Sequence, residues 1–268
     1  MKKLLTYACI ACLFVTGGIF YACKKNANGR NTLSLVDDAT VLSLSTQEYG
    51  TFMAANPPVT GTPEAAMVQR VGAKLTAAVN TYLAGKGKSD LVSGYQWEFN
   101  LVNNAEVNAW CLPGGKIVVY SGIMPLMPTD ADLAVVMGHE IAHAILKHGN
   151  ERMSQQLLVQ YGGAALSTML STKPQETREL FSNVYGISST LGVLAYSRKQ
   201  ETEADEMGLY IMATAGYDPN TAVSFWERMK ASSSGAKPPV FLSTHPNDDQ
   251  RIKDIQGFLP EAMKYYNP

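Results

Sequence analysis

Two histidines four residues apart restrict this chain of 268 residues more than any other feature. His139 and His143 belong to the sequence HEIAH, which lies in an apolar run with the periodicity of a buried helix. Residues four apart on a helix differ by about 40° around the axis and about 6 Å along it, so the two rings project side by side. They can share one metal ion, and Glu140 is close enough to act as a general base beside it. We therefore expect a helix that carries a metal site.

The same segment has the signals that begin a helix. Thr129 or Asp130 is a suitable N-cap, and Asp132 adds another acidic side chain to the first turn. The alternative interpretation is a helix with two core histidines and a buried glutamate. Burial of an unpaired carboxylate is costly, which disfavours that alternative.

Two histidines do not complete a catalytic zinc site, which needs three protein ligands and one open position. Another class of zinc enzyme has a third histidine soon after the motif, but Leu146 and Gly149 occupy the equivalent positions here. His148 would lie about 140° around the axis from His143 if the helix continued. We expect His148 at the surface or in a supporting contact, and the third ligand on another helix.

Residues 197–208 predict that second helix. Glu201 and Asp205 are four apart and share one face. Glu201 can bind the metal, and Asp205 can accept a hydrogen bond from the ring N–H of a metal-binding histidine. Glu203 is a rival ligand, but it lies about 200° from Glu201 around the axis. The alternative for the whole segment is a solvated acidic helix face.

The N-terminal part of the chain forms a separate unit. Two lysines precede an uncharged, mostly apolar run that ends at Ala22, and Cys23 follows. This pattern predicts an export signal over residues 1–22, and Ala22-Cys23 resembles the lipobox of bacterial lipoproteins. We expect cleavage before Cys23, lipid attachment to it, and a polar tether over residues 23–34. An uncleaved membrane anchor and soluble secretion are the alternatives.

Composition indicates that residues 35–268 form a globular domain. Apolar residues make up 46% of the chain and charged residues 17%, which excludes a disordered protein. The net charge of −1 gives no basic surplus for nucleic acid. We expect helices over 35–55 and 63–85, strands over 97–102, 105–112 and 116–120, and helices after residue 121. This order is typical of an α+β fold. Residues 149–196 are either a lid over the site or two ordinary helices with a connector.

Four motifs in a fixed order resemble one group of zinc peptidases. They are HEIAH, the Glu201-x-x-x-Asp205 pair, Asn108-Ala109 followed by Pro113-Gly114-Gly115, and Ser243-Thr244-His245-Pro246 with Arg251. Together they resemble the HtpX-like, type I CAAX prenyl protease-like and BepA-like gluzincins over residues 60–256. The short chain is most similar to the small bacterial lipoprotein-type members.

The resemblance implies a mainly helical, zincin-like domain with a small sheet before the metal-binding helix, and one Zn²⁺ per chain. It implies that Glu201 is the third ligand and that Asp205 supports a ligand. It also implies that the strand at Asn108, Ala109 and Trp110 lines the cleft and pairs with an extended substrate. His245 is expected at the site, either donating to the oxyanion or filling the open metal position, with a simple turn as the alternative.

The expected reaction is hydrolysis of internal peptide bonds, with Glu140 as the base. The substrates implied are unfolded or misassembled proteins of the bacterial cell envelope, with outer-membrane protein quality control as one role. The expected location is a membrane surface facing the periplasm, reached through the lipid anchor. The alternatives are an envelope chaperone or binding module that rarely cuts, and an aminopeptidase.

Overall fold

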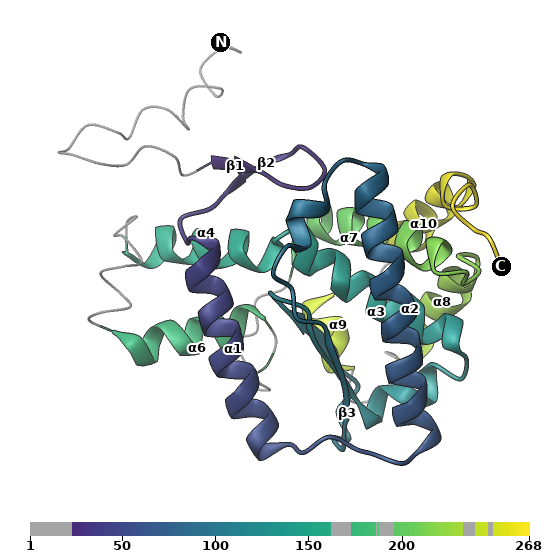
Figure 1. Cartoon of the computed structure of the whole chain (residues 1–268), viewed down its shortest axis with the longest axis horizontal. Helices are drawn as coiled ribbons and strands as arrows, with labels where there is room; N and C mark the ends of the chain where they lie inside the picture. The colour runs from purple at the N-terminus through teal and green to yellow at the C-terminus, as the bar shows by residue number, and fades with distance from the viewer. Residues whose placement is uncertain (1–22, 162–172, 186, 188–195, 233–238, 246–248) are drawn as a thin grey trace, which may run out of the picture.

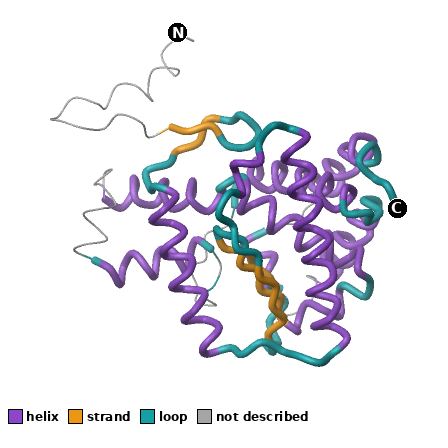
Figure 2. Tube along the Cα trace, in the orientation of Figure 1, coloured by secondary structure: helices purple, strands orange, loops and turns teal. Residues whose placement is uncertain are grey.

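The computed structural model describes residues 23–161, 173–185, 187, 196–232, 239–245 and 249–268, and the expected signal over 1–22 lies outside them. The described residues form an α+β fold in which helices stand on both sides of a small sheet, as the sequence predicts (Figures 1 and 2). The elements before the metal-binding helix are β1 (Cys23–Lys25), β2 (Asn31–Leu33), α1 (Asp38–Ala55), α2 (Pro63–Gly85), η1 (Ser89–Val92), β3 (Glu98–Val102), β4 (Ala109–Leu112), β5 (Lys116–Tyr120) and η2 (Ser121–Leu126). They are followed by α3 (Asp130–Ile145), α4 (His148–Tyr161), α6 (Pro174–Val184), α7 (Arg198–Thr214), α8 (Thr221–Ser232), α9 (Val240–Thr244) and α10 (Asp249–Ala262).

The central sheet has the strand order β3-β5-β4. β4 and β5 form an antiparallel hairpin whose turn contains Gly114 and Gly115, at φ 89° and 85°. Such φ values suit glycine because a Cβ atom disfavours them. β3 pairs with β5 in parallel, with Glu98 opposite Lys116. β4 therefore lies at one edge of the sheet, and the parallel pair was not apparent from the strand pattern.

The sheet separates two hydrophobic clusters, because alternate residues of a strand point to opposite faces. In β5, Ile117 and Val119 belong to the cluster that includes α2, α3 and α7. Val118 and Tyr120 belong to the cluster that includes α1, α4 and α6. All five residues of β5 are buried, so both faces of the sheet are covered.

Helix α3 lies in the larger cluster and is buried around its whole circumference. Thr129 is its N-cap, and the Thr129 hydroxyl and Asp132 carboxylate form a reciprocal capping box. Every residue from Asp132 to Ile145 is buried. α7 packs on α3 at two glycines: a Cβ added to Gly208 would lie 3.0 Å from His139 N, and one added to Gly138 would lie 3.1 Å from Gly208 O. The two helix backbones are thus in direct contact, with no room for a side chain at either glycine.

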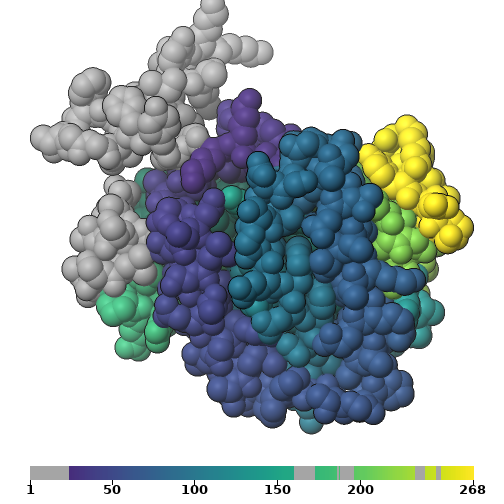
Figure 3. Space-filling view, in the orientation of Figure 1, coloured from purple at the N-terminus to yellow at the C-terminus, as the bar shows by residue number. Residues whose placement is uncertain are grey.

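Residues 23–34 do not form the polar tether expected from the sequence. They contain the antiparallel β1–β2 hairpin, which lies directly against the rest of the domain (Figure 3). Ala27 and Thr32 are buried, and Arg30 forms ion pairs with Glu151 of α4 and Glu203 of α7. The polar composition suggested a linker, but its arginine is held by carboxylates more than 100 residues away in sequence.

The helix that carries His139 and His143 ends before His148. α3 ends at Ile145, and Lys147 takes a left-handed conformation at φ 58° before α4 begins at His148. This break turns His148 back toward the site, where it is fully buried. Among the helices of the described residues, none has both the length and the apolar character needed to cross a bilayer.

Candidate metal centre

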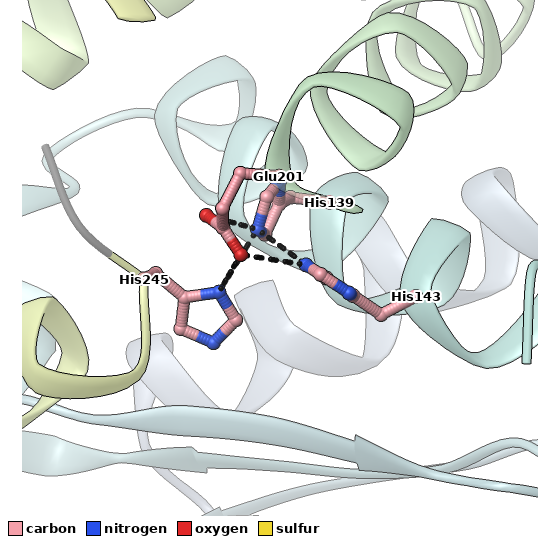
Figure 4. Close-up of side chains that lie close together, drawn as sticks. All are labelled: His139, His143, Glu201 and His245. Carbon is pink, nitrogen blue, oxygen red and sulfur yellow. Dashed lines mark hydrogen bonds and ion pairs between the residues drawn. The ribbon is translucent and has the colours of Figure 1, made fainter. Parts of the chain in front are cut away.

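Four buried side chains from three separate parts of the fold converge on one point. His139 and His143 come from α3, Glu201 comes from the first turn of α7, and His245 directly follows α9 (Figure 4). One donor atom from each lies within 4.8 Å of all the others. Sequence spacing predicted the histidine pair, the resemblance implied Glu201 as the third ligand and His245 at the site, and the structure places all four together.

The donor atoms are close to one another. His139 Nε2 lies 3.0 Å from His143 Nε2 and 3.1 Å from His245 Nδ1. Glu201 Oε1 lies 3.2 Å from His143 Nε2 and 3.1 Å from His245 Nδ1. Three imidazole nitrogens and a carboxylate therefore surround a single small space, as Figure 4 shows.

His245 is held in place by its own segment. Its N–H donates to Phe241 O at 2.9 Å, and its ring stacks on that of Phe241 with centroids 4.5 Å apart. Phe241 N in turn donates to Val107 O, just before β4. His245 is buried and directed into the cluster.

Glu140 lies beside the cluster, with a carboxylate oxygen that forms no hydrogen bond to any described residue. Its Oε1 lies 3.3 Å from His245 Nε2, yet has no partner in hydrogen-bonding geometry among the described residues. Burial raises the pKa of Glu140 above its ordinary value. A buried carboxylate with a free oxygen and a raised pKa is suited to accept and return a proton.

Asp205 and Arg251 support the cluster from behind. Asp205 Oδ1 lies 2.8 Å from His139 Nδ1, on the ring nitrogen that faces away from the cluster. Arg251 donates to both oxygens of Asp205 at 2.8 Å and lies 2.9 Å from Glu201 Oε2. Its guanidinium carbon lies 3.4 Å from the centroid of the Trp226 ring. Arg251 is itself buried.

His143 has a different support on its outward nitrogen. His148 Nδ1 lies 2.9 Å from His143 Nδ1, and His148 Nε2 lies 3.0 Å from Glu203 Oε2. Glu203 is directed toward His148 and Arg30 instead of the cluster, as its position around the helix suggested. Burial opposes ionisation of Glu203, but the bonds from His148 and Arg30 lower its pKa to about 2.

The charge state of the donors suits a cation. Burial alone would raise the pKa of Glu201, but His245, Arg251 and His139 outweigh it and hold that pKa well below its usual range. Burial and the neighbouring His139 lower the pKa of His143 well below the ordinary value. An ionised carboxylate and a neutral imidazole are the forms in which these side chains bind metals.

The donor set fits zinc. Unprotonated ring nitrogens that face one another at about 3 Å bring their lone pairs together, and a cation between them removes that conflict. Nitrogen and oxygen donors in a set of four are typical of tetrahedral zinc. His139, His143, Glu201 and His245 are the residues that would hold the ion.

The predicted substrate strand has two distinct faces. Asn108, Ala109 and Trp110 are buried at and before the start of β4. The Trp110 indole donates to the Tyr120 hydroxyl and packs edge-on against Phe52, so its side chain belongs to the cluster on the α1 side of the sheet. Any contact of Trp110 with a substrate at the metal side would therefore use its backbone.

A match to a family model covers this whole arrangement. Residues 65–259 match the model of peptidase family M48. The chain belongs to this family. Together with the four-residue cluster, membership identifies residues 65–259 as a zinc metallopeptidase domain, in agreement with the sequence prediction.

Curated relatives come from both mitochondria and bacteria. The mitochondrial metalloendopeptidase OMA1 of Schizosaccharomyces pombe is 37% identical over 182 residues, which cover 68% of this chain and 51% of the relative. The human metalloendopeptidase OMA1 is 32% identical over 65% of this chain and 34% of its own length. The beta-barrel assembly-enhancing protease of Yersinia pestis is 32% identical over 60% of this chain and 34% of its own length. The chain thus spans about half the length of the first of these relatives and a third of the other two.

We predict that Glu201→Ala strongly weakens zinc binding, because it removes the only carboxylate in the donor set. Glu206→Ala is the matched control, since Glu206 lies on the same helix and accepts a hydrogen bond from Tyr210. Metal content of the purified variants measures the effect. Full zinc occupancy in folded Glu201→Ala, or loss of zinc in Glu206→Ala, would contradict the assignment.

Proposed function

We propose that this metalloendopeptidase cleaves internal peptide bonds of unfolded or misassembled proteins at a bacterial cell envelope, including proteins of the outer membrane. The observation that carries the proposal is the buried Glu140 carboxylate, which has a free oxygen beside four convergent donors. A site that only stabilises the fold has no use for such a group. Similarity to the beta-barrel assembly-enhancing protease of Yersinia pestis supports the envelope as the location.

The chain's own residues account for binding and for proton transfer. Bound zinc would supply a Lewis acid for amide hydrolysis. Glu140 takes a proton from the attacking water and passes it to the leaving amine, which a raised pKa favours because the carboxyl must hold the proton between the two steps. His139 and Asp205 share a hydrogen bond that fixes the ring of His139.

The edge position of β4 supports an extended substrate. Among the described strands, none pairs with the edge of β4 that faces away from β5. A peptide that adds to this edge would be held by backbone hydrogen bonds. Such bonds require an extended backbone but do not depend on the side chains of the peptide. Unfolded chains supply that shape, so the proposed substrate class and the strand geometry agree.

We predict that Glu140→Gln retains zinc and the fold but lowers the rate of casein cleavage by about 10²–10⁴, the usual contribution of a general base. Glu64→Gln, at an exposed carboxyl on α2, is the matched control and should cleave normally. Cleavage is measured with and without a chelator.

Cleavage at the wild-type rate by zinc-loaded Glu140→Gln would refute the assigned base. A zinc-loaded wild-type protein that suppresses aggregation of casein without cutting it would instead favour the chaperone interpretation over the proteolytic one.

We propose that His245 closes the site in a resting state. With His245 included, all four positions of a tetrahedral metal would be taken by protein, whereas a catalytic site keeps one open. Its Nε2 also lies 3.3 Å from Glu140 Oε1, which places the ring between the base and the donor set. Movement of this one side chain would then open the site to substrate.

We therefore expect His245→Ala to raise basal cleavage of casein while zinc affinity falls, because the variant gives up a ligand and gains an open position. Steady-state rates at saturating zinc, together with a zinc titration, test this. A fall in kcat of about 10²–10³ would instead identify His245 as an oxyanion donor. Unchanged cleavage and zinc affinity would leave His245 with a purely structural role.

We also propose that the chain is held at a membrane by a lipid on Cys23. Ala22-Cys23 at the end of the apolar run supports this attachment point. Because β1 begins at Cys23 and the hairpin is docked, a lipid there would hold the catalytic domain directly at the membrane surface.

The expected result for Cys23→Ser is loss of lipidation and release from the membrane fraction, since serine offers no thiol for the lipid. Fractionation and mass spectrometry of the N-terminus check this, with Cys111→Ser as control because Cys111 is a free, buried thiol. A Cys23→Ser protein that stays with membranes and keeps residues 1–22 would support the uncleaved anchor.

A further inference from the structure

A line of polar contacts leads from the N-terminal hairpin to the metal centre. Arg30 Nε donates to Glu203 Oε1 at 2.7 Å, and Asn26 Nδ2 donates to Glu203 Oε2 at 3.2 Å. The second oxygen of Glu203 also lies 3.0 Å from His148 Nε2. His148 Nδ1 then lies 2.9 Å from His143 Nδ1. The catalytic assignment above leaves all of these side chains except His143 unused.

The hydrogen bonds in this line can be arranged in only one consistent way when His143 binds a metal through Nε2. The Glu203 carboxylate also accepts from Arg30 and Asn26 and so offers no proton of its own, which means that His148 Nε2 must carry the proton that joins them. Metal binding through His143 Nε2 leaves the proton of that ring on Nδ1. His143 Nδ1–H must then donate to His148 Nδ1, which is free to accept because the proton of His148 is on its other nitrogen.

We propose that Glu203 and His148 are positioning residues that fix the tautomer and ring orientation of His143, and that the N-terminal hairpin holds Glu203 for this task. The proposal deepens the proposed function, since it rests on His143 as a ligand. Asp205 contacts the outward nitrogen of His139 directly. Glu203 acts on the outward nitrogen of His143 in the same way, but through the imidazole ring of His148. Partners of this kind orient a ligand and raise its basicity.

Arg30 connects the hairpin to both α4 and α7. Arg30 donates to Glu151 through two nitrogens, at 2.7 Å each, and its third nitrogen donates to Glu203. Glu151 also accepts from Gln200 at 2.9 Å, so Arg30 ties α4 to the start of α7. Both oxygens of Glu203 are thereby held by the hairpin, Oε1 by Arg30 and Oε2 by Asn26, and Oε2 also faces His148.

Zinc affinity of the full mature chain, measured by competition with a chromogenic chelator, tests the proposal. We expect Glu203→Ala and His148→Leu each to weaken zinc binding by about 10–100-fold, as loss of such partners commonly does. The double variant should be little worse than either single one, because both break the same line of contacts. Arg30→Ala should cost less, since the Glu203–His148 bond remains.

Asp130→Ala is the matched control. It removes a carboxylate that is bound by two nitrogens of Arg70, at the opposite end of α3 from His143. This variant should lose stability without loss of zinc affinity. Wild-type zinc affinity in folded Glu203→Ala would overturn the proposal.

A second measurement uses only the wild-type protein, in case the variants do not fold. Nitrogen-15 NMR of the zinc-loaded protein reports the tautomer of each ring, and the chain has only four histidines. We expect His148 protonated on Nε2 and His143 on Nδ1. A proton on His148 Nδ1 would overturn the inference alone, whereas zinc binding without His143 would overturn the proposed site.

Discussion

The close approach of α3 and α7 is the constraint on which the site depends. Gly138 and Gly208 allow the two backbones to touch, since a side chain at either position would press on the backbone of the other helix. The helices run antiparallel, so Asp205 meets His139 while Glu201, one turn earlier, reaches His143. The convergence of donors from α3 and α7 thus follows from two residues that have no side chain of their own.

Burial of so many charges is possible because each one has a partner. Arg251 compensates Asp205 and Glu201 together, and its flat face rests on Trp226. Removal of one partner from such a group would leave the other buried and uncompensated, which is far costlier than loss of a surface pair. Glu140 has His245 Nε2 at 3.3 Å but, within the part of the chain that the structure describes, no hydrogen bond at its Oε1, and this oxygen lies beside the donor set, where proton transfer requires one.

Local signals in the sequence were sufficient for the two helices that carry His139, His143 and Glu201, whereas His245 was expected only from the resemblance. The spacing of His139 and His143, the cap at Thr129 and the four-residue step from Glu201 to Asp205 are all properties of single helices. They predicted which faces meet, and the observed distances agree with them.

Features that depend on distant contacts or on one unusual residue could not be predicted in this way. Lys147 adopts a positive φ without being glycine, so nothing in the helix pattern marks the break that turns His148 inward. The partners of Arg30 lie on α4 and α7, and the polar residues around it resemble a linker when read alone. The parallel pairing of β3 with β5 likewise depends on tertiary packing.

The docked hairpin also has a consequence for the order in which the chain folds. It is among the first described segments to be synthesised, yet Arg30 is 121 residues from Glu151 and 173 from Glu203. Contacts of such long range form late, because the loop between them must first be organised. The hairpin can therefore dock only after α4 and α7 have taken their places in the domain. The support that Glu203 and His148 give to His143 would in this way be completed by a contact that needs α4 and α7 to be in place first.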